Sequence, residues 1–313
     1  MNESAESPPA PNSGGAGGDA GESPSRVERD DFSVSSPAPP ELGAGAASGF
    51  LIPRLCIVGV GLIGGSIGLA AKTRNAAGHV VGVEANADTW ADALRIGAVD
   101  EITNDLAAGV RGADLVILAV PVGAILELLP KLPPLIGENT VVTDVGSVKT
   151  AIAEAGFAAL GGRFIPGHPM AGSEKGGVQN ARADLFDGAT WAFTSVQGQT
   201  DRGYPSLLLN FVQTLGASAH FLSPTNHDES VALTSHLPHI LAYTLGAMAF
   251  RHRTRDRQPV TKLAAGSWNS ATRVAESSPM LWLDISWHNH EALADEIDEC
   301  AEKLMWIADR LRK

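Results

Sequence analysis

The stretch Leu55–Gly68, LCIVGVGLIGGSIG, determines the fold that we expect for the first half of this chain. Its first four residues are apolar, which is the pattern of a short strand buried on both faces. A G-x-G-x-x-G turn follows, and the residues after it are compatible with a helix. Gly59 would allow the tight turn, Gly61 would let a pyrophosphate approach the backbone, and Gly64 would let the helix pack closely against the strand. The stretch therefore predicts a dinucleotide site.

A second expected strand, Val80–Val83, ends at Glu84. Its distance from the glycine turn is about that at which an acidic residue binds a ribose 2′-hydroxyl. A carboxylate there disfavours a 2′-phosphate, and neither of the next two residues is Arg. We therefore expect NAD, with NADP less favoured, and its phosphates on the N–H groups of Leu62 and Ile63 at the helix start. The alternative is a structural strand–turn–helix unit with a coincidental acid.

Short apolar runs alternate with helical patterns from residue 51 to residue 197, which predicts an α/β Rossmann-type, doubly wound parallel sheet. The further strands that we expect are Asp114–Val120, Thr140–Asp144, Arg163–Pro166 and Trp191–Ser195, with helices at Ala87–Ile96 and Val148–Leu160. Ligands of such sheets bind beyond the carboxyl ends of the strands. The residues that fall there include Val120, Pro121, Ser147 and His168. For Ser147, a helix cap is the alternative role.

Long helical periodicity replaces this alternation after residue 197, so we divide the chain into residues 51–197 and a helical domain of residues 198–313. Helices should start at Ser223-Pro224 and Ser278-Pro279, and Pro238 should kink or break the first of them. Residues 1–50 are rich in Pro, Gly, Ser and Ala and predict a disordered tail.

A stripe of apolar residues near the C-terminus recurs at alternating spacings of four and three. Its members are Leu293, Ile297, Cys300, Leu304, Ile307 and Leu311. Such a stripe is a helix-packing seam, and in a half with so few residues we expect it to pack on a second subunit as a homodimer. Burial against helices of the same chain is the alternative.

The composition limits the class of partner and the compartment. A net charge of −12 argues against nucleic acid and against an anionic membrane surface. The two cysteines exclude a disulfide framework and suit the reducing cytoplasm, which is where we expect the protein. We find no apolar run of membrane-spanning length and no signal-peptide pattern.

Three polar clusters are candidates for chemistry. His168 lies between Gly and Pro just after an expected strand, where an imidazole could accept a proton near neutral pH, although a structural turn histidine is the alternative. His227-Asp228 and Ser235–His239 lack the further ligands of a metal site, so we expect no metal and interpret His236 and His239 as polar groups lining a cleft. Arg273 follows Thr272 and could bind a carboxylate or form a surface ion pair.

These residues resemble an ordered set of family motifs. The matching segments are Gly59–Ser66, Asp144–Lys149, Gly167–Glu174, His227-Asp228, Ser235–His239 and Thr272-Arg273. Together they are similar to the prephenate/arogenate (cyclohexadienyl) dehydrogenase family over about residues 54–290. The resemblance implies oxidative decarboxylation of a cyclohexadienol acid to 4-hydroxyphenylpyruvate or tyrosine. It also implies a Rossmann domain followed by an all-helical dimerisation domain.

The resemblance assigns roles residue by residue. It implies that His168 takes the proton of the ring hydroxyl and that Ser147 binds the same hydroxyl or orients His168. It also implies that Arg273 binds the ring carboxylate. The other substrate-binding positions that it implies are Ser173, Glu174, Ser235, His239 and Trp282.

One segment departs from the family pattern. Many relatives have a basic–acidic pair shortly before Thr272-Arg273, whereas this chain has Trp268-Asn-Ser-Ala271, which leaves prephenate or arogenate open as substrate. Two other functions stay open on the residues alone. One is a reductase of the β-hydroxyacid dehydrogenase type, which needs a helical Lys with a nearby Asn that we do not find. The other is a regulatory protein that binds NAD without turnover.

Overall fold

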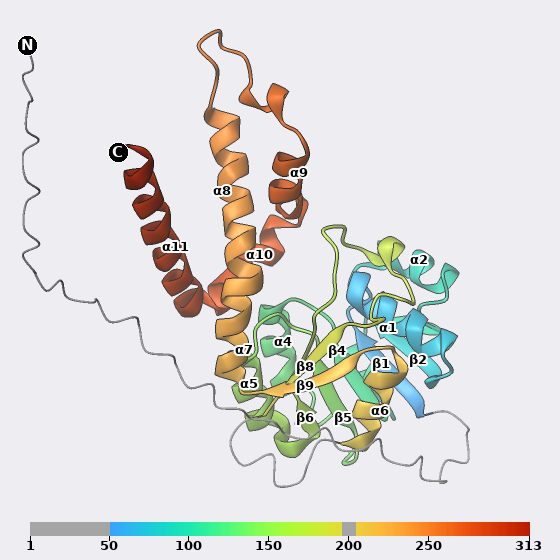
Figure 1. The fold of residues 1–313 in the computed structure, drawn as a ribbon. Coiled ribbons are helices and arrows are strands. Elements are labelled where there is room, and N and C mark those ends of the chain that lie inside the picture. Colours follow the sequence, from blue (N-terminus) through green and yellow to red (C-terminus); the bar gives the residue numbers. More distant parts are fainter. Residues whose placement is uncertain (1–50, 196–204) are drawn as a thin grey trace, which may run out of the picture. The chain divides into compact units, whose positions relative to one another are not determined.

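Six parallel strands form the main sheet, in the order β3-β2-β1-β4-β5-β6 (Figure 1). Their bounds are β1 Ile52–Val58, β2 Ala77–Val83, β3 Glu101–Thr103, β4 Leu115–Leu118, β5 Val141–Asp144 and β6 Phe164–Ile165. The strand order reverses between β1 and β4, where a doubly wound sheet has its ligand crevice. The predicted Rossmann-type fold is confirmed.

The computed structural model describes residues 51–195 and 205–313. All of them belong to one compact unit. The tail predicted for residues 1–50 and the domain boundary predicted between residues 197 and 198 lie outside the described residues.

Helices cover both faces of the main sheet. They are α1 Leu62–Thr73, α2 Trp90–Arg95, α3 Leu106–Val110, α4 Val122–Leu128 and α5 Thr150–Leu160. Because successive side chains of a strand point to opposite faces, β1 contributes to two separate cores. Leu55 and Ile57 pack in one core with α1, while Cys56 and Val58 pack in the other with α4 and α5. This double burial explains why the strand is apolar at every position from 55 to 58.

The strand expected at Trp191–Ser195 is present as β8 Thr190–Thr194, but it belongs to a second sheet. It pairs antiparallel with β7 Gly167–Pro169 and parallel with β9 Ser218–Leu222. We did not expect β9, because its segment was assigned to the helical half. Three of its five residues are exposed, and an exposed edge strand has no clear apolar alternation. Helix α6, Ser206–Thr214, precedes it and packs in the same core as α1.

The remaining residues are helical. The helices are α7 Pro224–Val231, α8 Leu237–Arg251, α9 Gly266–Thr272, α10 Pro279–His288 and α11 His290–Leu311. Both predicted helix starts are confirmed, since Ser223 accepts the N–H of Asn226 at 3.1 Å and Ser278 that of Leu281 at 3.5 Å. The helix expected to run through Pro238 is divided into α7 and α8, but the chain stays helical between them. A π-helical turn, residues 232–236, joins α7 to α8, and Pro238 lies in the first turn of α8, where its missing N–H is not needed.

Short 3₁₀ turns connect several of these elements. They are Ala87–Thr89, Leu129–Lys131, Gly161–Arg163, Val178–Asn180, Val260–Leu263 and Arg273–Glu276. Among the described helices, none combines the length and the apolar character needed to cross a bilayer.

The predicted apolar stripe lies on α11 and is mostly uncovered. Leu293 is buried, but Leu304, Ile307 and Leu311 are 55%, 46% and 83% exposed. Figure 1 shows α8 and α11 extending away from the strands, so the sheet does not cover their outer ends. Burial of this stripe by helices of the same chain was the alternative considered above. In the described residues those helices leave most of it exposed.

Candidate active site

The glycine turn after β1 has the shape of a phosphate cradle. Gly59 has a φ of +93°, and a Cβ there would lie 2.4 Å from the Ala119 carbonyl oxygen. A Cβ on Gly64 would lie 2.0 Å from the Gly59 oxygen, so only glycine permits this approach of helix to strand. By contrast, a Cβ on Gly61 would meet no atom within 4 Å. Open space therefore lies beside bare backbone at the start of α1, next to Leu62 and Ile63, which fits a dinucleotide pyrophosphate.

Glu84 lies at the end of β2 beside this cradle. Its Oε2 accepts the N–H of Val60 at 3.0 Å and its Oε1 accepts the N–H of Asn86 at 2.9 Å. The loop after β4 lies against the same turn, because Val120 Cγ1 would be 2.6 Å from a Cβ on Gly59. Pro121 follows in this loop and is the residue just before α4. The residues predicted from the sequence to bind cofactor thus meet at the switch point of the sheet.

A fully buried ion pair supports the strand that carries His168. Lys149 Nζ contacts an Asp144 carboxylate oxygen, and both side chains have no exposed surface. The same ammonium donates to the carbonyl oxygen of Gly167 at 2.7 Å, and Asp144 Oδ1 accepts the N–H of Gly167 at 3.0 Å. Burial raises the pKa of Asp144 and lowers the pKa of Lys149, and their mutual attraction offsets only part of this cost. The pair fixes the backbone next to His168.

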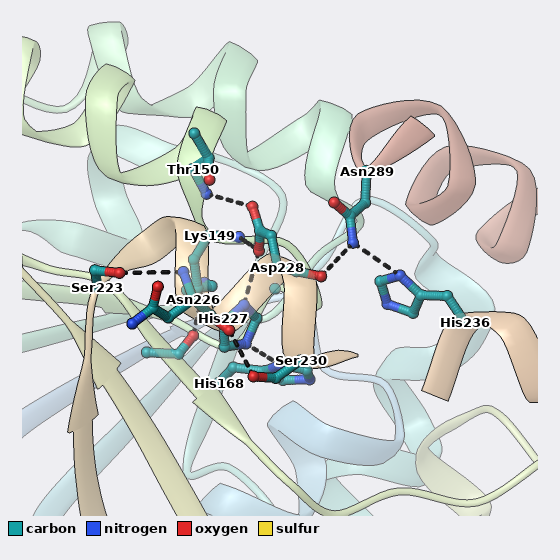
Figure 2. Close-up of polar contacts among 12 residues, drawn as sticks. Lys149, Thr150, His168, Ser223, Asn226, His227, Asp228, Ser230, His236 and Asn289 are labelled. Atoms are coloured by element: carbon teal, nitrogen blue, oxygen red, sulfur yellow. Dashed lines mark hydrogen bonds and ion pairs between the residues drawn. The ribbon is translucent and has the colours of Figure 1, made fainter. Parts of the chain in front are cut away.

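His168 is the first member of a chain of three side chains (Figure 2). Its Nδ1 lies 2.9 Å from Nε2 of His227, and Nδ1 of His227 lies 2.7 Å from Oδ1 of Asp228. The carboxylate of Asp228 also accepts the N–H groups of Lys149 at 2.7 Å and Thr150 at 2.8 Å, at the start of α5. His227 and Asp228 are buried. The sequence placed this His-Asp pair among the polar candidates but gave neither residue a role in the site.

Burial keeps these two histidines neutral. It lowers the pKa of His168 well below its usual value, and the neighbouring His227, Lys149 and His236 lower it further. Burial also lowers the pKa of His227, against the opposing effect of its hydrogen bond to Asp228. Burial raises the pKa of Asp228, but the hydrogen bonds from His227, Thr150 and Lys149 outweigh it and the net pKa is lowered. The site therefore contains two neutral imidazoles and one carboxylate near pH 7.

A second group of rings contains two of the predicted substrate-binding residues. The ring of buried His239 stacks on Trp282, with centroids 3.4 Å apart and planes at 16°, while His236 meets Trp282 edge-on. His239 Nε2 is buried and has no hydrogen-bond partner among the described residues. Burial lowers the pKa of His239 to about 4. The ring therefore has a nitrogen without a partner, and Ser235 is exposed on the π-helical turn that precedes α8.

Arg273 forms an ion pair, which was the alternative role considered for it, and its partner is Glu174. Arg273 Nη1 lies 2.6 Å from Glu174 Oε2, and the Arg273 side chain is 58% exposed. A hydrogen bond from its own backbone lowers the pKa of Glu174, and the charge of Arg273 adds to this effect against some desolvation. The contact joins the loop after β7 to the turn after α9. It brings together two residues that the sequence assigned to the substrate site.

The other two predicted residues make less specific contacts. Ser173 is exposed, and its hydroxyl accepts the N–H of Lys175 at 3.1 Å. Ser147 is half-buried in the loop between β5 and α5. Within the described part of the chain, no hydrogen bond joins its hydroxyl to His168. No group of three or more His, Cys, Asp or Glu side chains suited to a metal ion occurs in residues 51–195 and 205–313.

Comparison with known proteins gives the family. The model for the prephenate dehydrogenase nucleotide-binding domain matches residues 67–221, and the model for the prephenate dehydrogenase dimerization domain matches residues 223–313. The prephenate dehydrogenase of Bacillus subtilis is 37% identical over 251 residues, which span 78% of this chain and 66% of that protein. The cyclohexadienyl dehydrogenase of Zymomonas mobilis is 34% identical over 249 residues, which span 78% of this chain and 84% of that protein.

Comparison with solved structures gives the same family. Prephenate dehydrogenase from Aquifex aeolicus, in complex with hydroxyphenyl propionate and NAD+, superposes with a TM-score of 0.77 at 30% identity, covering 83% of this chain and 90% of that one. A 3-hydroxyisobutyrate dehydrogenase from Salmonella typhimurium has a TM-score of 0.54 at 14% identity over 80% of this chain and 88% of that one, which is a likeness of fold alone. The chain therefore belongs to the prephenate dehydrogenase family.

Proposed function

We propose that the protein catalyses the NAD-dependent oxidative decarboxylation of prephenate, arogenate or both. The observation that carries this proposal is the neutral His168, which lies beyond the carboxyl ends of the strands with its Nδ1 hydrogen-bonded to His227. Membership of the prephenate dehydrogenase family supplies the substrate class. A neutral imidazole in such a place is suited to take a proton from a substrate hydroxyl.

The nicotinamide, when bound, supplies the hydride acceptor. His168 would take the proton of the ring hydroxyl as the hydride leaves the same carbon, with Ser147 binding that hydroxyl or orienting His168. Loss of CO₂ makes the ring aromatic, so the protein needs mainly to align the reactants and supply a base. Arg273 would bind the ring carboxylate, with Glu174 as its partner at the pocket rim together with Ser173. Ser235, His239 and Trp282 would line the site for the side chain.

A direct assay tests this function. The purified protein is mixed with NAD and with prephenate or arogenate in turn, and NADH formation is followed by absorbance. We expect turnover with at least one of the two. Tight NAD binding with no NADH from either substrate would instead favour a regulatory protein that binds NAD without turnover.

We further propose that NAD is preferred over NADP, because a 2′-phosphate would meet the carboxylate of Glu84. The KM for NADP should exceed that for NAD by about 10-fold or more, which corresponds to about 1.4 kcal/mol. Glu84→Ser should reduce this ratio. Glu127→Ser, which removes an exposed acid on α4, is the matched control and should leave the ratio unchanged. A clear NADP preference of the unmodified protein would mean that Glu84 does not contact the ribose.

We also propose that the protein is a cytoplasmic homodimer. The uncovered apolar stripe on α11 and the match of residues 223–313 to a dimerization domain support the dimer. The free thiols of Cys56 and Cys300 suit a reducing compartment. Light scattering of the native protein should give twice the chain mass of 32.5 kDa.

A further inference from the structure

The hydrogen bonds that join Asp228, His227 and His168 determine which ring nitrogen of each histidine carries the proton. An ionised carboxylate only accepts hydrogen bonds, and the Asp228 carboxylate accepts three, from His227 and from the backbone of Lys149 and Thr150. His227 must therefore carry its proton on Nδ1. Because the imidazole of His227 is neutral, its Nε2 has a lone pair and is the acceptor in the next bond. His168 must then donate from Nδ1, which leaves its Nε2 without a proton.

We propose that His227 and Asp228 are positioning residues that hold His168 in the tautomer with Nε2 free to accept the substrate proton. The chemical part of this inference rests on the function proposed above, whereas the tautomer does not depend on it. An imidazole without such a partner populates both neutral tautomers, and only one of them presents a base at Nε2. Two buried residues would thus decide the protonation state of the atom that reacts.

The proton balance of the proposed reaction shows why a fixed base matters. The ring O–H bond breaks and an N–H bond forms at His168 Nε2, while the electron pair of the adjacent C–H bond leaves with the hydride. The C–CO₂ bond then breaks and its electron pair enters the ring. The product is a phenol that retains its hydroxyl, so the reaction releases no proton overall and the proton on His168 must return to the ring oxygen. The site therefore has to stabilise the imidazolium form of His168 only until this proton returns.

A charged His168 would be costly in this site without a negative partner. It would lie near the buried ammonium of Lys149, whose charge lowers the pKa of His168. Asp144 is paired with that ammonium and with the backbone of Gly167. Asp228 is the carboxylate that the hydrogen-bond chain joins to His168, and it stabilises the imidazolium through His227. Asn289 holds the backbone of Asp228, because its Nδ2 donates to the Asp228 carbonyl oxygen at 2.8 Å.

The first experiment reads the tautomer directly. The full-length protein is labelled with ¹⁵N-histidine, and ring carbon-bound protons are correlated with the ring nitrogens by NMR. The signals of His168 are identified by their loss in His168→Asn. We expect a proton on Nδ1 and none on Nε2 of His168, and in His227→Phe, which removes the acceptor, a mixture of both tautomers. A proton on Nε2 in the unmodified protein would overturn the proposal whether or not the protein turns over prephenate or arogenate.

The second experiment separates positioning from mere packing. His227→Phe keeps a ring of similar size and should lower kcat by about 10²-fold with little change in the KM values, since a mispositioned base loses transition-state stabilisation. His227→Gln keeps an acceptor for His168 and should restore a substantial part of kcat. His220→Gln, an exposed histidine on β9, is the matched control and should behave as the unmodified protein. If His227→Phe is folded and its kcat falls by less than about 3-fold, the proposal is wrong.

If His227→Phe does not fold, the tautomer in the unmodified protein and the kinetics of His227→Gln still test the proposal. A proton on Nδ1 of His168 together with at least partial activity of His227→Gln supports the proposal. A proton on Nε2 contradicts it. If the unmodified protein turns over neither substrate, the proposed function fails, and the NMR result still tests the tautomer.

Discussion

Replacing His168 with Asn should lower kcat by about 10²–10⁴-fold while the Kd for NAD stays unchanged. Asparagine is close in size and has no group that accepts a proton near neutral pH, so the variant loses the base. The glycine cradle and Glu84 do not contact His168 and should bind the cofactor as before. Steady-state kinetics and a fluorescence titration with NAD give the two quantities.

The exposed His220 offers the matched control, because His220→Asn makes the same chemical change away from the site and should keep the full rate. A kcat for His168→Asn within about 10-fold of the unmodified protein would remove His168 from the proposed mechanism. Weaker NAD binding with a proportionate loss of rate would point to a change of structure instead.

Replacing Lys149 with Met should lower the free energy of unfolding by about 3–5 kcal/mol, because it leaves the buried Asp144 without its partner. Urea unfolding, followed by circular dichroism, measures the loss. The matched control is Lys72→Met, which breaks the ion pair of Lys72 with Asp100. Those two side chains are 32% and 30% exposed, so that loss should be about 1 kcal/mol or less.

The loss in Lys149→Met should also depend on pH. Without the ammonium, burial keeps the folded-state pKa of Asp144 above its value in the unfolded chain, which is about 3.9. A group with a raised folded-state pKa favours folding below the unfolded value and loses that contribution as the pH rises. The deficit relative to the unmodified protein should therefore be larger at pH 7 than near pH 4. A deficit independent of pH would mean that Asp144 finds another partner.

The parts of the fold that could be predicted from the sequence are those whose structure follows from their own residues. Leu55–Val58 is apolar because both faces of β1 are buried, and the glycines after it are required by approaches as close as 2.0 Å. The strand β9 has no such cause in its own residues. It forms because β8 offers it an edge, and its exposed side chains give no periodic pattern.

The same distinction applies to the site. His168 could be singled out because Gly and Pro fix its backbone after a strand. The role of His227 could not, because its contact with His168 joins residues 59 positions apart and depends on how α7 packs on the second sheet. Asp144 and Lys149 are charged residues of kinds usually found on the surface, and nothing in a five-residue separation predicts that both are fully buried.

The carboxylate of Asp228 belongs to α7, yet two of its hydrogen bonds come from backbone N–H groups at the start of α5, the helix between β5 and β6 of the main sheet. A second bond has the same direction, since the Gly123 N–H in the first turn of α4 donates to Asp284 of α10 at 3.2 Å. If the helical part separated from the sheet, each side would be left with polar groups lacking partners. Melting of the helical part therefore strips α4 and α5 of their caps, and we expect the two parts to lose their structure together as one cooperative unit.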